Sequence, residues 1–172
     1  MKKLITCLTV STLSGAAFAT TWTVDDDGKA DFDNIQAAVD AASDGDEIVV
    51  MPGTYTSTGD EVVNIYGKSL LLRSFEGAEN TIIDGEILRA GIRLSDYNVN
   101  NFSVYGFTIQ NCLLIGDEFQ MGLGAAIHTG NFKVVDISNC VFNNNSTSGN
   151  NSEGGAIYVG AHNNCVITNC QF

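Results

Sequence analysis

Apolar and polar positions near the end of the chain repeat with a fixed period. The Gly-x-Ala-Ile segment at 124–130 returns at 154–160, so the offset is 154 − 124 = 30. Residues 135–142 return with the same offset at 165–172, and both copies keep alternating apolar residues, an Asn-Cys pair and a final Phe. Two segments that share one period of this length predict a repeat protein, in which each unit buries its apolar face against its neighbours.

Short segments with strand-like alternation follow one another along most of the chain. We expect strands at 22–24, 47–51, 62–65, 69–73, 81–83, 91–94, 102–110, 125–129, 133–138, 156–159 and 165–168. Residues rich in Gly, Asn and Asp separate them, and 52–55 (Pro-Gly-Thr-Tyr) is expected to form a turn. Two longer insertions, 113–123 and 143–152, interrupt the repeat.

The repeat predicts columns of equivalent side chains from successive coils. We expect Val135, Ile137, Cys140 and Phe142 to stack under Cys165, Ile167, Cys170 and Phe172, with Ile109 and Cys112 beginning these columns one coil earlier (137 − 109 = 28). A second column should contain Ile92, Ile127 and Ile157. One corner should be marked by Asn111, Asn139 and Asn169. The residues expected to face solvent are Asp136, Ser138, Thr168, His128 and Tyr158.

One segment has convincing helical periodicity. Its apolar stripe is Ile35, Ala38, Val39 and Ala42. We expect Asp33 as N-cap with Gln36 completing a capping box, Phe32 stapled onto Ala37, and Asp44-Gly45 at the end. A single helix suits the lid of a stack of coils. The predicted fold class is therefore all-β, a right-handed parallel β-helix (solenoid) of roughly four coils with one N-terminal capping α-helix.

The first nineteen residues have the pattern of a secretory signal peptide. Lys2 and Lys3 precede a mostly apolar segment, and Ala17-Phe18-Ala19 predicts cleavage after Ala19. The mature chain would have 172 − 19 = 153 residues, with the cap helix and first strand at 20–56 and the β-helix coils at 57–172. We expect a secreted or cell-surface location and no transmembrane segment in the mature chain.

Charge and cysteine content narrow the classes of partner. The formal net charge of −12 becomes −14 when the two lysines of the signal peptide are removed. Such acidity argues against nucleic acid and anionic membranes as partners, and it is compatible with calcium. Export would permit disulfides. However, the repeat positions favour small core residues over bridges for Cys112, Cys140, Cys165 and Cys170.

Three early segments, at 35–42, 45–50 and 52–55, resemble the opening of pectin-lyase-like right-handed β-helix proteins, and 81–85 resembles their second coil. The Gly-x-Ala-Ile segments and Phe142-Asn143-Asn144-Asn145 are similar to repeats of chlamydial polymorphic outer membrane proteins. Together these resemblances cover most of 22–172 and imply the fold. They do not choose an activity, because the same scaffold carries lyases, hydrolases, esterases and adhesins.

We assign no catalytic, cofactor-binding or metal-binding residue from the sequence. The acidic segment 25–33 fails the EF-hand spacing because Lys29 occupies a ligand position. His128 is replaced by Tyr158 and Asp136 by Val166 in the next repeat, which favours solvent-facing positions over a site. Asp117 and Glu118 lie on an insertion, and His162 is far from His128 in the sequence, without further ligands at metal-site spacing.

The leading functional hypothesis is an exported, non-catalytic β-helix domain with a glycan-binding, surface-binding or adhesin-like role. The alternative is a carbohydrate-active enzyme such as a pectate or uronate lyase. This alternative requires a basic residue beside carboxylates on one outward face, with Arg93, Lys133, Asp136 and His128 as the candidates. A third possibility is a truncated domain that does not fold alone. Because Phe172 closes a strand segment, we also expect further coils or a partner beside this end.

Overall fold

The computed structural model describes residues 19–95, 101–116, 124–130, 134–149, 152, 154–160 and 164–172. Along the chain, its elements are β1 (Thr21–Val24), α1 (Ile35–Ala41), β2 (Glu47–Val50), β3 (Gly53–Tyr55), β4 (Glu61–Ile65), β5 (Leu70–Ser74), β6 (Thr81–Asp84), β7 (Ala90–Leu94), β8 (Asn101–Tyr105), β9 (Thr108–Gln110), β10 (Leu113–Gly116), β11 (Ile127–Thr129), β12 (Val134–Ser138), β13 (Val141–Asn143), β14 (Ser146–Gly149), β15 (Ile157–Val159) and β16 (Asn164–Thr168).

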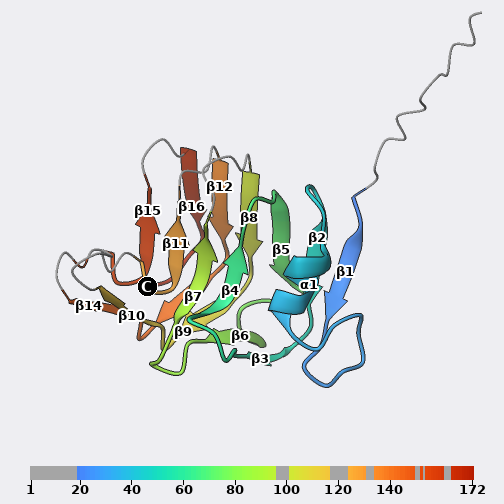
Figure 1. The fold of residues 1–172 in the computed structure, drawn as a ribbon, viewed down its shortest axis with the longest axis horizontal. Helices are drawn as coiled ribbons and strands as arrows, with labels where there is room; N and C mark the ends of the chain where they lie inside the picture. Colours follow the sequence, from blue (N-terminus) through green and yellow to red (C-terminus); the bar gives the residue numbers. More distant parts are fainter. Residues whose placement is uncertain are drawn as a thin grey trace, which may run out of the picture.

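The strands form parallel sheets that wind into a solenoid (Figure 1). The six-stranded sheet has the order β1-β2-β5-β8-β12-β16, the β4–β15 sheet has the order β4-β7-β11-β15, and the β3–β13 sheet has the order β3-β6-β9-β13. Strands β10 and β14 form a separate parallel pair. The coils are therefore four in number among the described residues, and β16 adds a further strand to the six-stranded sheet. The predicted fold class is confirmed: a strand-rich parallel β-solenoid with one short N-terminal helix.

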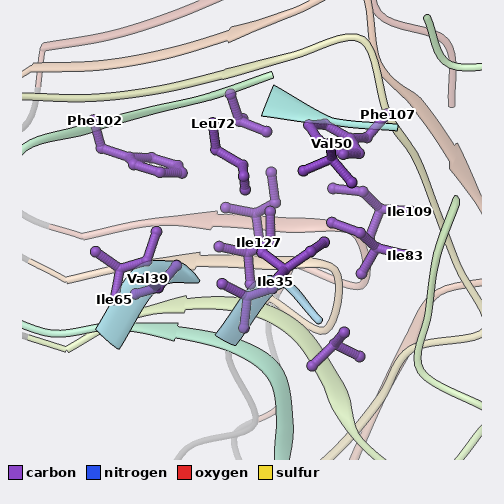
Figure 2. Close-up of a cluster of buried hydrophobic side chains, with 14 of the residues drawn as sticks. Ile35, Val39, Val50, Ile65, Leu72, Ile83, Phe102, Phe107, Ile109 and Ile127 are labelled. Atoms are coloured by element: carbon purple, nitrogen blue, oxygen red, sulfur yellow. The ribbon is translucent and has the colours of Figure 1, made fainter. Parts of the chain in front are cut away.

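The core lies inside the coils, where side chains from the sheets and from α1 point toward one another (Figure 2). Ile92, Ile127 and Ile157 are in register, as predicted, and Val63 extends their column to β4. Val135 and Ile137 pair with Cys165 and Ile167, again as predicted. In a different column, which contains Ile109, Phe142 and Phe172 stack their rings with centroids 5.1 Å apart, as the predicted pairing requires. Burying such side chains is the main favourable term in folding.

The start of these columns was predicted wrongly. Ile109 pairs with Phe142, an offset of 142 − 109 = 33, and Val104 is the residue that pairs with Ile137. Cys112 lies opposite Asn145, whose Oδ1 accepts a hydrogen bond from the Cys112 backbone N–H at 3.0 Å. Cys112 is thus at a different corner from Cys140.

The asparagine corner is corrected in the same way. Asn111 shares its corner with Asn144, whose Nδ2 donates to Asn111 Oδ1 at 2.8 Å. Asn139 and Asn169 occupy another corner, together with Gly106. All five residues have positive φ, from 52° to 77°. Both corners need a residue that tolerates the left-handed conformation, so similar sequences recur at two different places in the coil.

Several strand boundaries also differ from the predictions. The expected strand 102–110 is two strands, because the chain turns at Gly106 with φ +77°. The segment 52–55, expected as a turn, contributes strand β3. Strands β10, β13 and β14 were not predicted. The remaining predicted strands are present with small shifts at their ends, and Lys133, at the start of one of them, lies outside the described residues.

Helix α1 has the predicted apolar stripe but different ends. Asn34, and not Asp33, is the N-cap, and its Oδ1 accepts from the Ala37 backbone N–H at 2.8 Å. Gln36 does not complete a capping box. It bonds both backbone groups of Asn64 on β4, its Nε2 donating to the carbonyl at 3.1 Å and its Oε1 accepting from the N–H at 2.7 Å. Gln36 therefore joins the helix to the first strand of the β4–β15 sheet.

The end of α1 is also attached to a neighbouring segment. The helix stops at Ala42 in an extended conformation, before the predicted Asp44-Gly45. Lys68 Nζ donates to the Val39 and Asp40 carbonyls at 2.8 and 3.0 Å, so a side chain from a neighbouring loop satisfies carbonyls of the last turn. The Phe32 ring packs on Trp22, with centroids 5.6 Å apart, and its contact with Ala37 stays a prediction.

No helix in the described part of the chain has the length and apolarity needed to cross a membrane. The predicted signal peptide lies, apart from Ala19, outside the described residues, and the predicted boundary near residue 56 stays a prediction. At the other end of the solenoid, Ile167 is 41% exposed and Phe172 is 72% exposed. Further coils or a partner beside β16 likewise stay a prediction.

The carboxylate of Asp46 links strand β1 to the first coil through hydrogen bonds. Asp46 is 4% exposed. Its Oδ1 accepts from the Thr20 backbone N–H at 2.7 Å, and its Oδ2 accepts from the Ser43 backbone N–H at 2.8 Å and from Trp22 Nε1 at 3.1 Å. The hydrogen bond from Ser43, with those from Thr20 and Trp22, lowers the pKa of Asp46 despite the opposing effect of burial.

We expect Asp46→Asn to lower the free energy of unfolding by about 2 kcal/mol at neutral pH, because hydrogen bonds to a charged acceptor are lost. Since the folded-state pKa lies below the unfolded value of about 3.9, the stabilisation is complete above that value and is lost as the pH falls through the folded-state pKa. Urea unfolding of the wild type and Asp46→Asn, from neutral pH to a pH below the folded-state pKa, measures the difference between their free energies of unfolding. Asp60→Asn, at an exposed carboxylate, is the control. A difference between wild type and Asp46→Asn that persists undiminished in acid would contradict this account.

The repeated glycines Gly124 and Gly154 have φ of +62° and +61°. A Cβ on Gly124 would overlap the Ile127 carbonyl and the Tyr158 backbone nitrogen, whereas a Cβ on Gly45, at φ +90°, would meet no atom within 4 Å. We expect Gly45→Ala to cost about 1 kcal/mol, for the left-handed conformation alone. Gly124→Ala should cost at least about twice as much, because backbone atoms must also move. Thermal unfolding compares the stabilities of the two variants. Equal losses of stability would show that close packing between coils is unimportant at Gly124.

Candidate functional site

A shallow groove of about 340 Å³ crosses the outer face of the six-stranded sheet. Successive residues of a strand point to opposite faces, so alternate residues of β5, β8 and β12 reach this outer face. The register arranges them in two rows. One row is Leu71, Ser103 and Asp136, and the other is Arg73, Tyr105 and Ser138. The groove therefore combines an aromatic ring, hydroxyl groups, a cation and a carboxylate from three coils.

Arg73 is held at one side of the groove by Glu47. Its Nε donates to Glu47 Oε1 at 2.6 Å, and Glu47 Oε2 also accepts from Thr21 Oγ1 at 3.0 Å. The hydrogen bond from Arg73 lowers the pKa of Glu47, with help from Thr21 and against the effect of burial. Arg73 and Glu47 thus form a charge-assisted pair in which the guanidinium is oriented and its charge is locally balanced.

Tyr105 gives the groove an exposed aromatic surface. Its side chain is 45% exposed, although it is at the centre of the row formed with Arg73 and Ser138. A tyrosine ring offers an apolar face and a polar hydroxyl, which together suit ligands that also have apolar and polar sides. Ser103 and Ser138 place hydroxyl groups on the neighbouring positions. This part of the groove can contact the ring and the hydroxyls of a sugar.

Asp136 has an unsatisfied oxygen. Its Oδ1 is buried and has no hydrogen-bond partner among the described residues. The row neighbours of Asp136 are Ser103 on β8 and Val166 on β16. A carboxylate oxygen that is removed from water without a donor is costly, and such groups in native proteins call for an explanation. Asp136 therefore has hydrogen-bonding capacity that the described residues do not use and that a ligand could satisfy.

Of the candidates drawn from the sequence for a lyase, Arg93 and His128 are neighbours, and Asp136 lies apart from them. Arg93 and His128 lie in the outward row Asn64–Arg93–His128–Tyr158 of the β4–β15 sheet, whereas Asp136 is on the six-stranded sheet. Arg93 pairs with Glu61 at 2.9 Å. The His128 ring contacts the Tyr158 ring, with centroids 5.3 Å apart. Lys133, Asp117, Glu118 and His162 lie outside the described residues.

Sequence reasoning missed Arg73 and Tyr105. Both sit in predicted strands at outward positions, so their exposure could have been inferred from the alternation. Their proximity could not. The offset from Arg73 to its partner Tyr105 is 105 − 73 = 32, and that from Tyr105 to Ser138 is 138 − 105 = 33. Neither equals the offset of the visible repeat.

The acidic segment near the N-terminus distributes its carboxylates among separate partners. Asp26 Oδ2 accepts from the Thr54 backbone N–H at 3.2 Å, Asp27 pairs with Lys29 at 3.0 Å, and Asp31 bonds Thr23. In the described part of the chain, no group of three or more His, Cys, Asp and Glu residues could hold a metal ion. The calcium considered from the sequence therefore gains no support from this segment.

A second pocket, of about 490 Å³, lies between α1 and the segment that joins β3 to β4. Several of its polar groups already serve the fold. Gln36 bonds the backbone of Asn64, Glu61 pairs with Arg93, and Ser57 Oγ donates to the Glu61 carbonyl at 2.6 Å. The outer groove contains a buried carboxylate oxygen without a donor, so the groove is the better candidate site.

The four cysteines of the described chain are free thiols. Burial raises the pKa of Cys112 to about 12 and that of Cys140 to about 11. Burial, together with the charge of Asp136, also raises the pKa of Cys165. Thiols with raised pKa values are weak nucleophiles. The predicted role of Cys140 and Cys165 as core residues in stacked columns agrees with their register and packing.

No model of a protein family matches the chain, and neither curated proteins nor solved structures give a significant match. The site must therefore be interpreted from its own chemistry.

Proposed function

We propose that this protein is an exported, non-catalytic β-helix domain that binds a glycan at the cell surface or outside the cell through the groove on its six-stranded sheet. The observation that carries the proposal is the groove itself. It crosses three successive strands and sets the exposed ring of Tyr105 between hydroxyl and charged side chains. Protein sites for small molecules and sugars combine apolar contact area with a few placed polar groups in this way.

The spacing of carboxylates supports binding without cleavage. Glu47 and Asp136 are in the same outward row but are separated by β5 and β8. Three steps between neighbouring strands amount to about 14 Å. Glycosidases place their two carboxyl groups about 5 Å or about 6.5–9.5 Å apart, depending on the stereochemical outcome. In addition, Glu47 is already engaged by Arg73, so this pair does not suit acid–base hydrolysis.

The proposed location and ancestry rest on the sequence. The signal-peptide pattern ending at Ala19 supports export. We further propose membership of the pectin-lyase-like superfamily, with repeats related to those of chlamydial polymorphic outer membrane proteins. What supports this is the helix-capped first coil and the in-register Gly-x-Ala-Ile repeats, whose glycines share one left-handed conformation.

Substitution of the exposed tyrosine tests the proposed glycan site. We expect Tyr105→Ala to weaken binding to the glycan by at least about tenfold, because a central aromatic contact is lost. Tyr66→Ala is the matched control, since Tyr66 is 68% exposed and lies outside the groove. A glycan array identifies ligands and titration calorimetry measures the affinities. Unchanged affinity in Tyr105→Ala, or the same loss in both variants, would refute this location of the site.

The second candidate function is a uronate lyase, and Arg73 is the observation that favours it. Arg73 lines the same groove as Asp136 and contacts Glu47, so a basic residue does lie beside carboxylates on one outward face. Against it, Arg73 Nε already donates to Glu47 Oε1 at 2.6 Å, so Glu47 holds the side chain that a lyase would need as its base.

We therefore expect the protein to produce no unsaturated uronide from pectate or alginate, with or without calcium, as followed by ultraviolet absorbance. Product formation by the wild type that disappears in Arg73→Ala, while Arg89→Ala retains it, would instead establish the lyase and refute the non-catalytic proposal.

A further inference from the structure

We propose that the groove is selective for a glycan that carries free, protonated amino groups, and that Asp136 is the residue that confers this selectivity. This inference rests on the glycan-binding function proposed above and adds the chemical class of the ligand.

The charges of the groove favour a cationic ligand. Of the described residues that line it, Arg73 is the one cation, and its charge is balanced by Glu47 at 2.6 Å. Asp136 takes part in none of the ion pairs formed by the described residues. Arg73 and Glu47 together leave the negative charge of Asp136 uncompensated, on a chain whose formal net charge is already −12. Such a surface attracts cations and repels a polyanion such as a uronate polymer.

The hydrogen-bonding state of Asp136 favours a strong donor. Its Oδ1 has lost contact with water and has gained no donor in exchange. The terminal torsion of an aspartate is broad, so the carboxylate can turn an oxygen toward the groove when a donor arrives. An ammonium group brings three N–H donors and a positive charge, and charge-assisted hydrogen bonds of this kind are stronger than those from neutral hydroxyl groups.

The residues around Asp136 can contact the rest of a sugar whose ammonium group binds the Asp136 carboxylate. Ser103 and Leu71 continue its row across β8 and β5, and Tyr105 and Ser138 form the adjacent row. A sugar ring over Tyr105 can therefore direct an amino substituent to Asp136 while its hydroxyls face the serines. Selectivity comes from one carboxylate, and the rest of the binding area is shared by any glycan that fits.

Titration calorimetry with three oligosaccharides of equal length tests the inference. The probes are a glucosamine oligomer with free amines, its N-acetylated counterpart and a galacturonate oligomer. We expect the free-amine oligomer to bind at least tenfold more tightly than the acetylated one, and the galacturonate oligomer to bind more weakly than both. In Asp136→Asn the preference for the free amine should fall to a ratio near one. Tyr105→Ala should weaken both glucosamine-type oligomers alike.

Two controls keep the test decisive. Asp60→Asn changes the net charge by the same amount at an exposed position outside the groove and should retain the preference. Asp136→Ser introduces the residue already present at the equivalent position of β8, Ser103, and replaces Asp136→Asn if that variant unfolds.

The outcomes separate the two proposals. Equal affinity of the wild type for the free and acetylated oligomers, stronger binding of galacturonate, or a preference retained in the Asp136 variants would overturn the selectivity and leave glycan binding standing. If none of these oligomers binds and a glycan array also gives no ligand, the proposed function itself is overturned.

Discussion

The in-register stacking of parallel strands is the constraint on which the rest of this structure depends. Among the described residues, strands of successive coils pair in register, so side chains at equivalent positions lie next to one another. Inside the solenoid, this favours residues that pack well against the same residue type on the next coil, as in the isoleucine column and the Phe142–Phe172 ring stack. At one corner it produces a chain of side-chain hydrogen bonds, in which Asn111 Nδ2 donates to Asp84 at 3.0 Å and Asn144 Nδ2 donates to Asn111 Oδ1 at 2.8 Å.

The same register creates the candidate site without any local motif. Outside the coils, stacking does not demand like residues, so consecutive coils can place different groups side by side. Leu71, Ser103 and Asp136 form one row for this reason, and Arg73 is brought beside Tyr105. Each of three coils contributes two or three residues to the groove, so single substitutions can alter its chemistry while the inward columns that hold the strands together are unchanged.

The helical period, the strand alternation and the long repeat predicted the helix stripe, most strands and the columns of the last two coils. Prediction failed where coil length changes. Ile137 pairs with Ile167 on the next coil (167 − 137 = 30) but with Val104 on the previous one (137 − 104 = 33). Ile109 and Cys112 were therefore assigned to the wrong columns, and Arg73 was not placed beside Tyr105. Prediction also failed at α1. A local capping rule predicted that Gln36 would cap the start of the helix, whereas its side chain forms hydrogen bonds with the backbone of Asn64. Both the column assignments and the role of Gln36 depend on contacts between distant parts of the chain, and rules based on local sequence do not include such contacts.

Two carboxylates show how structural and functional roles can be distinguished here. Asp46 is almost fully buried, but three donors surround its oxygens, and its partners Thr20, Trp22 and Ser43 belong to the segments it joins. Its burial is explained entirely within the chain. Asp136 lines an open groove, yet its buried Oδ1 has no donor and its charge has no ion-pair partner among the described residues. A buried polar atom that the fold does not satisfy lowers the stability of the fold. The β16 strand carries Val166 at the same place and pairs in the same register, so the fold does not require a carboxylate there, and this supports the proposed ligand-binding role of Asp136.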